Sequence, residues 1–229
     1  MKIGGLQKVS LIDYPGHVSA IVFTQGCNFR CPYCHNPELV DPLRYRECVE
    51  EKEIISFLLK RQGKLDAVSL SGGEPTLQSG VITFLRRLKD MGYLVKVDTN
   101  GSRPDILEKM IEEGLLDYIA MDIKAPLEKY PTIVRSEVNP DSINRSISLV
   151  RSSGLAYEFR TTLVKALLGL DDILQIAKWI SPARRYVLQG FVRSEVLDER
   201  LLNESPPSPD ELEKIKKTIE KYLPSIWIR

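Results

Sequence analysis

The chain has 229 residues, and 43% of them are apolar, so it is long enough to form one domain with a large core. Its 32 basic and 31 acidic residues leave a formal net charge of +1, which favours neither nucleic acid nor an anionic membrane as a partner. It contains no apolar run of signal-peptide or membrane-spanning length. Because its four cysteines show no pairing framework, a reducing compartment suits them, and we expect a cytoplasmic protein.

In chain order, short apolar runs alternate with helical patterns. A turn at 13–16 separates two apolar segments, which predicts a hairpin leading into a first buried strand at 18–23. Further strands are expected at 67–70, 93–97, 118–121, 157–164 and 186–189. Helices are expected at 51–61, 81–91, 104 to about 114, 142–153, 171–179 and 211–222.

This alternation predicts parallel strands joined by helical crossovers. We count roughly six such units, fewer than the eight that close a full barrel. The expected fold is therefore an α/β, partial (open) TIM-type barrel in a single domain. It would comprise an N-terminal hairpin (1–17), a barrel core (18–190) and a C-terminal extension with a helix (191–229).

Three cysteines, Cys27, Cys31 and Cys34, lie on one glycine- and proline-punctuated loop directly after the first buried strand. A cube of four irons normally takes four cysteine thiolates. A cube held by only three leaves one iron without a protein ligand, and an outside molecule can bind there. The triad therefore favours an iron–sulfur cluster with an open site.

Two other interpretations of the triad are weaker. A zinc site could take His17, His35 or Cys48 as its fourth ligand, but zinc thiols usually come in two separated pairs, and this chain has no second pair. A disulfide would leave an odd thiol. Cys48 lies among charged residues, and we expect it to take no part in the chemistry.

Polar motifs follow the next strands where each strand ends. They are Gly72-Gly73-Glu74-Pro75, Asp98-Thr99-Asn100-Gly101 and Asp122-Ile123-Lys124, and Arg160 and Gln189 lie on later strands. Each motif alone could be an ordinary turn. Because active sites of parallel barrels lie at the carboxyl ends of the strands, we expect these motifs to share one rim.

With Tyr33 just before the third cysteine, the triad and the Gly-Gly-Glu-Pro element resemble the radical S-adenosylmethionine (SAM) superfamily over 18 to about 189. The resemblance implies a [4Fe–4S] cluster on Cys27, Cys31 and Cys34, with SAM chelating the open iron. One electron would then cleave SAM to a 5′-deoxyadenosyl radical, which removes a hydrogen atom from a substrate. Gly72, Gly73 and Glu74 would meet the SAM amino group, Tyr33 the adenine and Lys124 the carboxylate, with Asn36 beside the cluster and Arg160 and Gln189 completing the site.

Asp98 and Asp122 allow two interpretations. Aspartates after strands are usually solvated or cap helices. Two carboxylates beside that of SAM would instead need a cation between them. In glycyl-radical activating enzymes a monovalent cation has this role, and Asp98, Thr99 and Asp122 match the residues that supply it.

The segments Cys31–Glu38 and Leu6–Gly16 point to one branch of the superfamily. The first resembles activating enzymes of glycyl radical enzymes, and the second is similar to anaerobic ribonucleoside-triphosphate reductase activating proteins. The resemblance implies that a hydrogen is taken from a glycine α-carbon of a partner glycyl radical enzyme, an anaerobic ribonucleotide reductase. An external one-electron donor such as flavodoxin or ferredoxin is expected, because the chain carries no ferredoxin-type insert. One departure is Gln189, since pyruvate formate-lyase activating enzymes have a histidine near the comparable place.

Two alternatives remain at this point. A radical SAM enzyme acting on a small nucleotide- or pterin-like substrate could bind its anionic group through Arg160, Arg184, Arg185 or Arg193. A non-catalytic metal-binding interaction module would need no SAM site, and the motifs at the strand ends argue against it.

Overall fold

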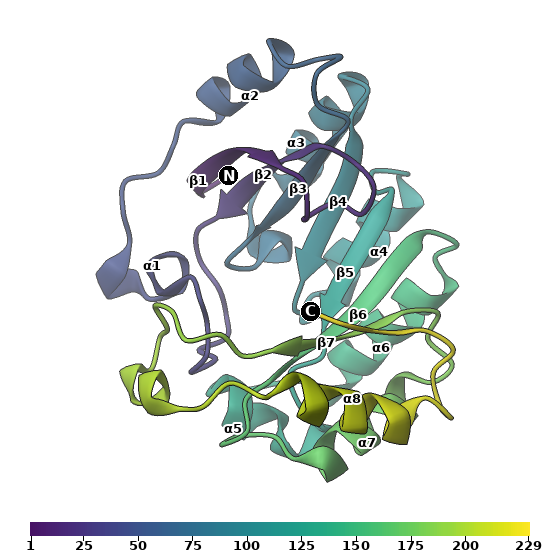
Figure 1. Ribbon diagram of the computed structural model, residues 1–229. Coiled ribbons are helices and arrows are strands. Elements are labelled where there is room, and N and C mark those ends of the chain that lie inside the picture. Colours follow the sequence, from purple (N-terminus) through teal and green to yellow (C-terminus); the bar gives the residue numbers. More distant parts are fainter.

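The computed structural model describes residues 1–229 and contains one eight-stranded sheet whose strands lie in chain order (Figure 1). The strands are β1 (Ile3–Ser10), β2 (Ser19–Thr24), β3 (Ala67–Gly72), β4 (Leu94–Thr99), β5 (Tyr118–Asp122), β6 (Ala156–Leu163), β7 (Tyr186–Gly190) and β8 (Ile226–Ile228). β1 pairs antiparallel with β2, and every later neighbouring pair is parallel. The two edge strands, β1 and β8, do not pair with each other. The predicted open, partial α/β barrel is confirmed.

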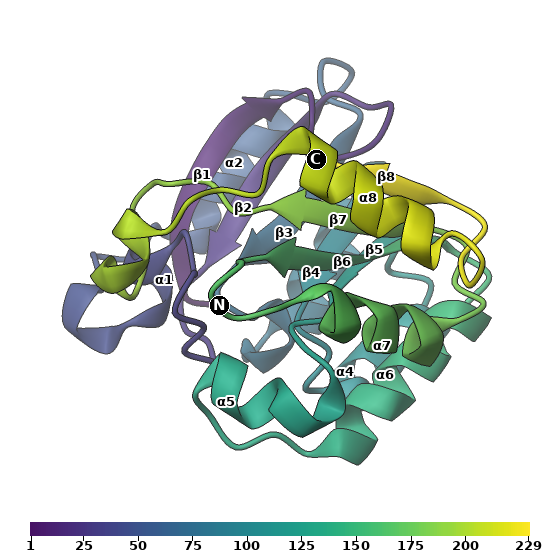
Figure 2. The same cartoon turned by 60° about the horizontal axis from the view of Figure 1, so that its bottom comes forward.

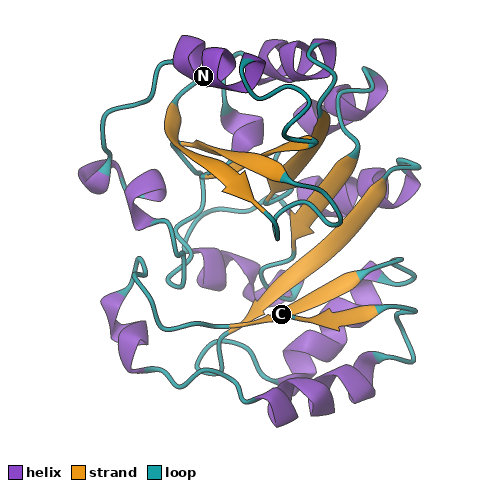
Figure 3. Cartoon of the chain, turned by 45° about the horizontal axis from the view of Figure 1, so that its top comes forward, coloured by secondary structure: helices purple, strands orange, loops and turns teal.

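Helices connect the strands and surround the sheet (Figure 3). They are α1 (Pro37–Val40), α2 (Glu51–Leu59), α3 (Val81–Asp90), α4 (Pro104–Glu112), α5 (Tyr130–Val134), α6 (Pro140–Ser152), α7 (Leu170–Ile180) and α8 (Pro209–Ile219). Short 3-10 turns are η1 (Pro42–Arg44), η2 (Pro75–Leu77), η3 (Leu127–Lys129) and η4 (Glu199–Asn203). The helix expected at 81–91 is α3, and its apolar side chains Phe84, Leu85 and Leu88 are buried while Arg86 and Arg87 are exposed.

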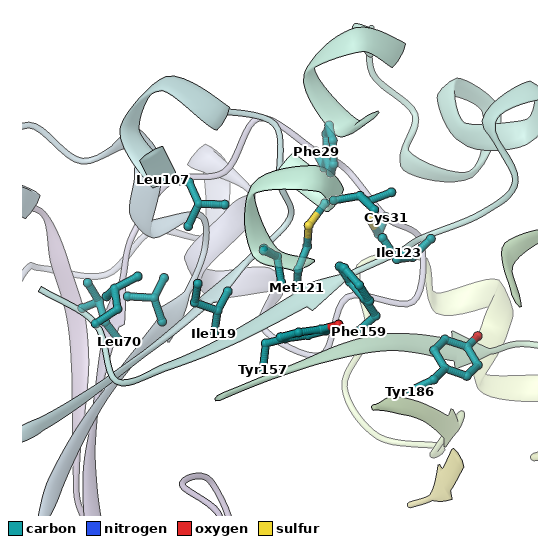
Figure 4. Close-up of a cluster of buried hydrophobic side chains, with 14 of the residues drawn as sticks. Phe29, Cys31, Leu70, Leu107, Ile119, Met121, Ile123, Tyr157, Phe159 and Tyr186 are labelled. Carbon is teal, nitrogen blue, oxygen red and sulfur yellow. The ribbon is translucent and has the colours of Figure 1, made fainter. Parts of the chain in front are cut away.

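The two faces of the strands differ in polarity. In β4, Val95 and Val97 belong to the large apolar core, while Lys96 and Asp98 alternate with them and point to the opposite, inner face. The core reaches the cysteine loop, because Phe29 and Cys31 lie next to Met121 and other core side chains at the end of β5 (Figure 4). The apolar layer therefore stabilises the barrel from outside and leaves the polar inner face for chemistry.

Two helices begin earlier than expected because side chains cap their N-terminal ends. α6 begins at Pro140, because the Asn139 side chain accepts a hydrogen bond from the Asp141 N–H. α8 begins at Pro209, two residues before the expected start at 211, because Ser208 and Glu211 form a capping box. The short elements α1, α5 and β8 carry too few residues to show a period, and the sequence did not predict them.

The C-terminal segment completes the second edge of the sheet. α8 packs beside α7, and β8 adds parallel to β7 (Figure 2). The Arg229 guanidinium donates to both carboxylate oxygens of the fully buried Glu158 on β6, at 3.0 and 3.1 Å. No helix combines the length and apolar character needed to cross a membrane.

Candidate active site

One pocket opens at the carboxyl ends of the parallel strands, beside the cysteine loop, and has a volume of about 260 Å³. Every site residue that the sequence predicts lines it: Cys27, Cys31, Tyr33, Cys34, Asn36, Gly72, Gly73, Glu74, Asp98, Thr99, Asp122, Lys124, Arg160 and Gln189. Motifs that are up to 162 positions apart in the chain therefore meet in one place, as the strand order requires.

The cysteine loop (25–36) is held in place by segments far away in sequence. The Arg30 N–H donates to the Val134 carbonyl oxygen at the end of α5 (2.8 Å). After β7, the Leu197 N–H donates to the Cys34 carbonyl oxygen (3.1 Å). Because a loop rich in glycine and proline forms no regular ladder of its own, these outside bonds hold its shape. The C-terminal extension is thus part of the support of the site, which the sequence did not indicate.

All three pocket thiols are poor nucleophiles in their present surroundings. Burial raises the pKa of Cys27 to about 12 and that of Cys31 to about 11, and it also raises the pKa of Cys34. A thiol with such a pKa stays protonated at neutral pH until a metal ion displaces its proton. The donor set therefore suits metal coordination and does not suit a free nucleophilic cysteine.

The spacing of the thiols distinguishes between metal sites. No three thiol, imidazole or carboxylate groups lie close enough together to hold a single metal ion. A zinc ion needs such convergence, whereas each thiolate on a four-iron cube binds a different iron. His35 Nδ1 lies 2.7 Å from the Ser194 hydroxyl, and Cys48, which is not disulfide-bonded, lies outside the pocket. The residues present fit a cluster held by three cysteines better than zinc or a disulfide.

Gly72 and Gly73 allow the ends of β2 and β3 to approach closely. Gly72 has a φ of +101°, and a Cβ on Gly73 would lie 2.2 Å from the carbonyl oxygen of Gly26. The N–H groups of Gly73 and Glu74 donate to the carbonyl oxygens of Thr24 and Gly26, both at 2.8 Å. Because its N–H is used, the Gly73 backbone can offer a ligand only its carbonyl oxygen, which suits an ammonium group.

Glu74 lines the pocket and is 1% exposed. Its carboxylate accepts hydrogen bonds from the Thr76 N–H (3.1 Å) and hydroxyl (2.5 Å), the Thr99 hydroxyl (2.8 Å) and the Asn100 N–H (2.7 Å). Burial nevertheless raises the pKa of Glu74 above its usual value. A cation placed against this carboxylate would therefore stabilise its charged form.

Five charged side chains alternate in sign across the inner face of the barrel. Asp98 pairs with Lys96 (2.5 Å) and Arg160 (3.2 Å), and Asp122 pairs with Arg160 (2.8 Å) and Lys124 (2.9 Å). Burial alone would raise the carboxyl pKa values, but the neighbouring cations hold the pKa of Asp98 and that of Asp122 below the usual range. Three cations face two carboxylates, which leaves one positive charge to be balanced.

The geometry differs from the expected cation site. The Arg160 guanidinium pairs with both Asp98 and Asp122 and therefore supplies the positive charge that two adjacent carboxylates need. The Thr99 hydroxyl donates to Glu74. The monovalent cation stays a prediction, and in this structure the charge between the two aspartates is already balanced by a side chain.

Three predicted residues present polar groups without protein partners. The Tyr33 hydroxyl is buried and has no hydrogen-bond partner. Asn36 is the N-cap of α1 but makes no side-chain capping bond, and the Gln189 side-chain amide makes no hydrogen bond within the chain although it lines the pocket. A buried polar group without a partner is costly, so the Tyr33 hydroxyl suits a polar ligand in the pocket, where the half-buried Asn36 and Gln189 side chains are also free to bind one.

Six further residues line the pocket and were not predicted: Phe29, His35, Val40, Ser71, Asn100 and Thr162. Strand alternation could have placed Thr162 beside Arg160 on the inner face, and Ser71 beside the glycines. Asn100 was part of the motif in which Asp98 and Thr99 received a role. Phe29, His35 and Val40 lie in irregular or short segments, where sequence spacing does not show which way a side chain points.

Residues 21–186 match the family model described as the radical SAM superfamily. The chain belongs to this superfamily. A protein of Methanocaldococcus jannaschii named as a glycyl-radical enzyme activating enzyme is 35% identical over 99% of this chain and 95% of its own length. A second one from this organism is 30% identical over 97% and 84% of the two chains. The chain is therefore a radical SAM enzyme of the activating-enzyme family, with a [4Fe–4S] cluster and SAM as its cofactors.

A solved structure supports the fold independently. Streptococcus suis SuiB bound to S-adenosylmethionine matches with a TM-score of 0.64 at 16% identity, over 91% of this chain and 51% of that chain. This chain thus spans about half of the length of SuiB. Membership of an enzyme family excludes the non-catalytic metal-binding module considered above.

Proposed function

We propose that this radical SAM enzyme activates a glycyl radical enzyme by removing a hydrogen atom from a glycine α-carbon of that partner. The observation that carries the proposal is the single pocket in which the three cysteines, the Gly72–Glu74 backbone and the charged inner face meet. Relatives named as activating enzymes over nearly the whole chain support the reaction type.

In this proposal Cys27, Cys31 and Cys34 hold the cluster. The bound cofactors supply the chemistry, since one-electron reduction of the SAM sulfonium releases a 5′-deoxyadenosyl radical that takes the hydrogen. The protein orients the cofactors and excludes water, because the thiols lie against the apolar core at Phe29 and Met121.

The charges of the pocket match those of the methionine part of SAM. Its ammonium group suits the buried Glu74 carboxylate and the carbonyl oxygens of Gly72 and Gly73. Its carboxylate suits the one uncompensated positive charge of the inner face, at Lys124 and Arg160. The unpartnered Tyr33 hydroxyl and the amides of Asn36 and Gln189 remain for the polar groups of the adenosine.

We propose an anaerobic ribonucleotide reductase as the partner and an external carrier, flavodoxin or ferredoxin, as the electron donor. The similarity of the Leu6–Gly16 segment to activating proteins of that reductase supports the partner. This segment forms β1 and the turn after it, at the free edge of the sheet. Cys48 is the only cysteine outside the triad, so the chain cannot hold a second cysteine-ligated cluster to relay electrons.

The test is anaerobic incubation of the reconstituted enzyme with SAM, a reductant and a candidate partner. With an anaerobic ribonucleotide reductase we expect a glycyl radical doublet in the electron paramagnetic resonance spectrum, together with 5′-deoxyadenosine. A doublet with pyruvate formate-lyase alone would overturn the choice of partner. If 5′-deoxyadenosine forms but no glycyl radical enzyme shows a doublet, the substrate is a small molecule and the proposal is wrong.

A further inference from the structure

Asn100 lies directly after β4, lines the pocket and is 5% exposed. Its side-chain oxygen accepts a hydrogen bond from the Ser102 N–H at 2.9 Å. Because a backbone N–H can only donate, this bond fixes which end of the amide is the oxygen. The Asn100 Nδ2 group therefore has to point the opposite way, where it donates to the Asn28 side-chain oxygen (2.9 Å) and to the Cys27 sulfur (3.8 Å).

Within the triad, Cys27 is the thiol that a protein side chain reaches. Its sulfur also accepts a hydrogen bond from the Phe29 N–H at 3.4 Å, and Asn100 is the one side chain that donates to any of the three pocket sulfurs. The Asn100 N–H donates to the buried Glu74 carboxylate at 2.7 Å. One residue thus contacts both the thiol proposed to hold the cluster and the carboxylate proposed to face the SAM ammonium.

We propose that Asn100 raises the reduction potential of the cluster through its amide–sulfur hydrogen bond. The inference rests on the proposed function, because it takes Cys27 as a cluster ligand. Reduction adds one electron from an external donor to the cluster, transfers no proton, and increases the negative charge that the cysteine sulfurs share. An N–H donor at a sulfur stabilises this more negative state, and hydrogen bonds to sulfur are among the factors that set iron–sulfur potentials.

The burial of the donor strengthens the effect. Asn100 is 5% exposed and the Cys27 thiol is half-buried, and a hydrogen bond that is partly shielded from water is electrostatically stronger than one in water. Without Asn100, an external electron carrier would have to be a stronger reductant to reduce the cluster. Asn100 is therefore a positioning and tuning residue and does not itself react.

Two variants test the proposal by anaerobic potentiometric titration of the reconstituted enzyme, followed by electron paramagnetic resonance of the reduced cluster. Asn100→Asp keeps the oxygen that accepts from Ser102 but places an anionic oxygen against the Cys27 sulfur. Asn100→Ser keeps a turn-forming side chain that is too short to reach the sulfur. We expect the midpoint potential to shift to more negative values in both, and further in Asn100→Asp.

The matched control is Thr162→Val, an isosteric change in a side chain that lines the same pocket and donates to no cysteine. Its potential should equal that of the unchanged enzyme. Unchanged or more positive potentials in both Asn100 variants would overturn the inference. If the unchanged enzyme binds no cluster, the proposed function itself fails, so the two failures are distinguishable.

A measurement on the unchanged enzyme keeps the proposal testable if the variants lose the cluster. Electron–nuclear double resonance on the reduced protein, with ¹⁵N in the asparagine side chains, should show a nitrogen coupled to the cluster. Absence of any asparagine ¹⁵N coupling would contradict the hydrogen bond.

Discussion

Arg160 offers the sharpest test of how the inner face is stabilised. Its guanidinium pairs with Asp98 at 3.2 Å and with Asp122 at 2.8 Å, and its side chain is 12% exposed. The substitution Arg160→Met keeps most of the aliphatic stem and removes the charge. Each aspartate then keeps one lysine partner, but the two carboxylates lose the cation that they share.

The expected cost follows from the burial of the pair. Removing one partner of a buried ion pair typically costs about 3–5 kcal/mol, because the remaining charge stays desolvated. The lysine partners that remain at 2.5 and 2.9 Å reduce this loss. We therefore expect Arg160→Met to lower the free energy of unfolding by about 2–4 kcal/mol at pH 7, measured by urea unfolding of the metal-free protein.

The pH dependence adds a second signature. The folded state holds the pKa of Asp98 and that of Asp122 below the unfolded value of about 3.9, so their contribution is present above that pH and is lost as the pH falls through the folded pKa. Without Arg160 these pKa values rise toward normal, and less stabilisation remains to be lost in acid. The difference between the two proteins should therefore shrink as the pH falls from 7 to 3.

An exposed ion pair supplies the matched control. Arg103 pairs with Asp105 at 2.8 Å, but the two side chains are 43% and 52% exposed. Arg103→Met should therefore cost less than about 1 kcal/mol. The reasoning is refuted if Arg160→Met costs no more than Arg103→Met, or if its effect is the same at pH 7 and pH 3.

Three further sets of substitutions test other parts of the structure. Alanine at Cys27, Cys31 or Cys34 should reduce bound iron from about four atoms per chain to near none, whereas Cys48→Ala should retain the full complement in an iron assay. Gly73→Ala would place a Cβ 2.2 Å from the Gly26 carbonyl oxygen and should lower stability by about 1–3 kcal/mol in urea, while Gly5→Ala, whose Cβ would meet no atom closer than a Phe23 side-chain carbon at 3.8 Å, should cost less. Glu158→Gln weakens the two bonds from the partly exposed Arg229 and should cost about 2 kcal/mol, seen as a lower melting temperature; an unchanged melting temperature would contradict a role for this pair.

Patterns that repeat locally made much of this molecule predictable. The short apolar run at 93–97 indicated a strand, which is β4, and the succession of strands and helices indicated parallel pairing. Because parallel strands place their carboxyl ends at one rim, the motifs after each strand could be expected to share a pocket. That expectation required no knowledge of any side-chain contact.

Contacts between distant segments were not predictable in this way. The hydrogen bond from Leu197 to the cysteine loop joins residues from distant parts of the chain, and no local pattern of apolar residues could indicate it. The position of Arg160 between two aspartates depends on the register of β5 and β6, which the sequence does not display. Likewise, the orientation of the Asn100 amide depends on Ser102 and Asn28, so its contact with Cys27 became visible only in three dimensions.

The most direct measurement concerns the iron that no cysteine binds. In the anaerobically reconstituted and reduced enzyme, addition of SAM should change the electron paramagnetic resonance spectrum of the cluster, because the cofactor becomes a ligand of that iron. A spectrum that stays the same at saturating SAM would mean that a protein group already occupies the open coordination site of this iron, and the assignment of the pocket would be wrong.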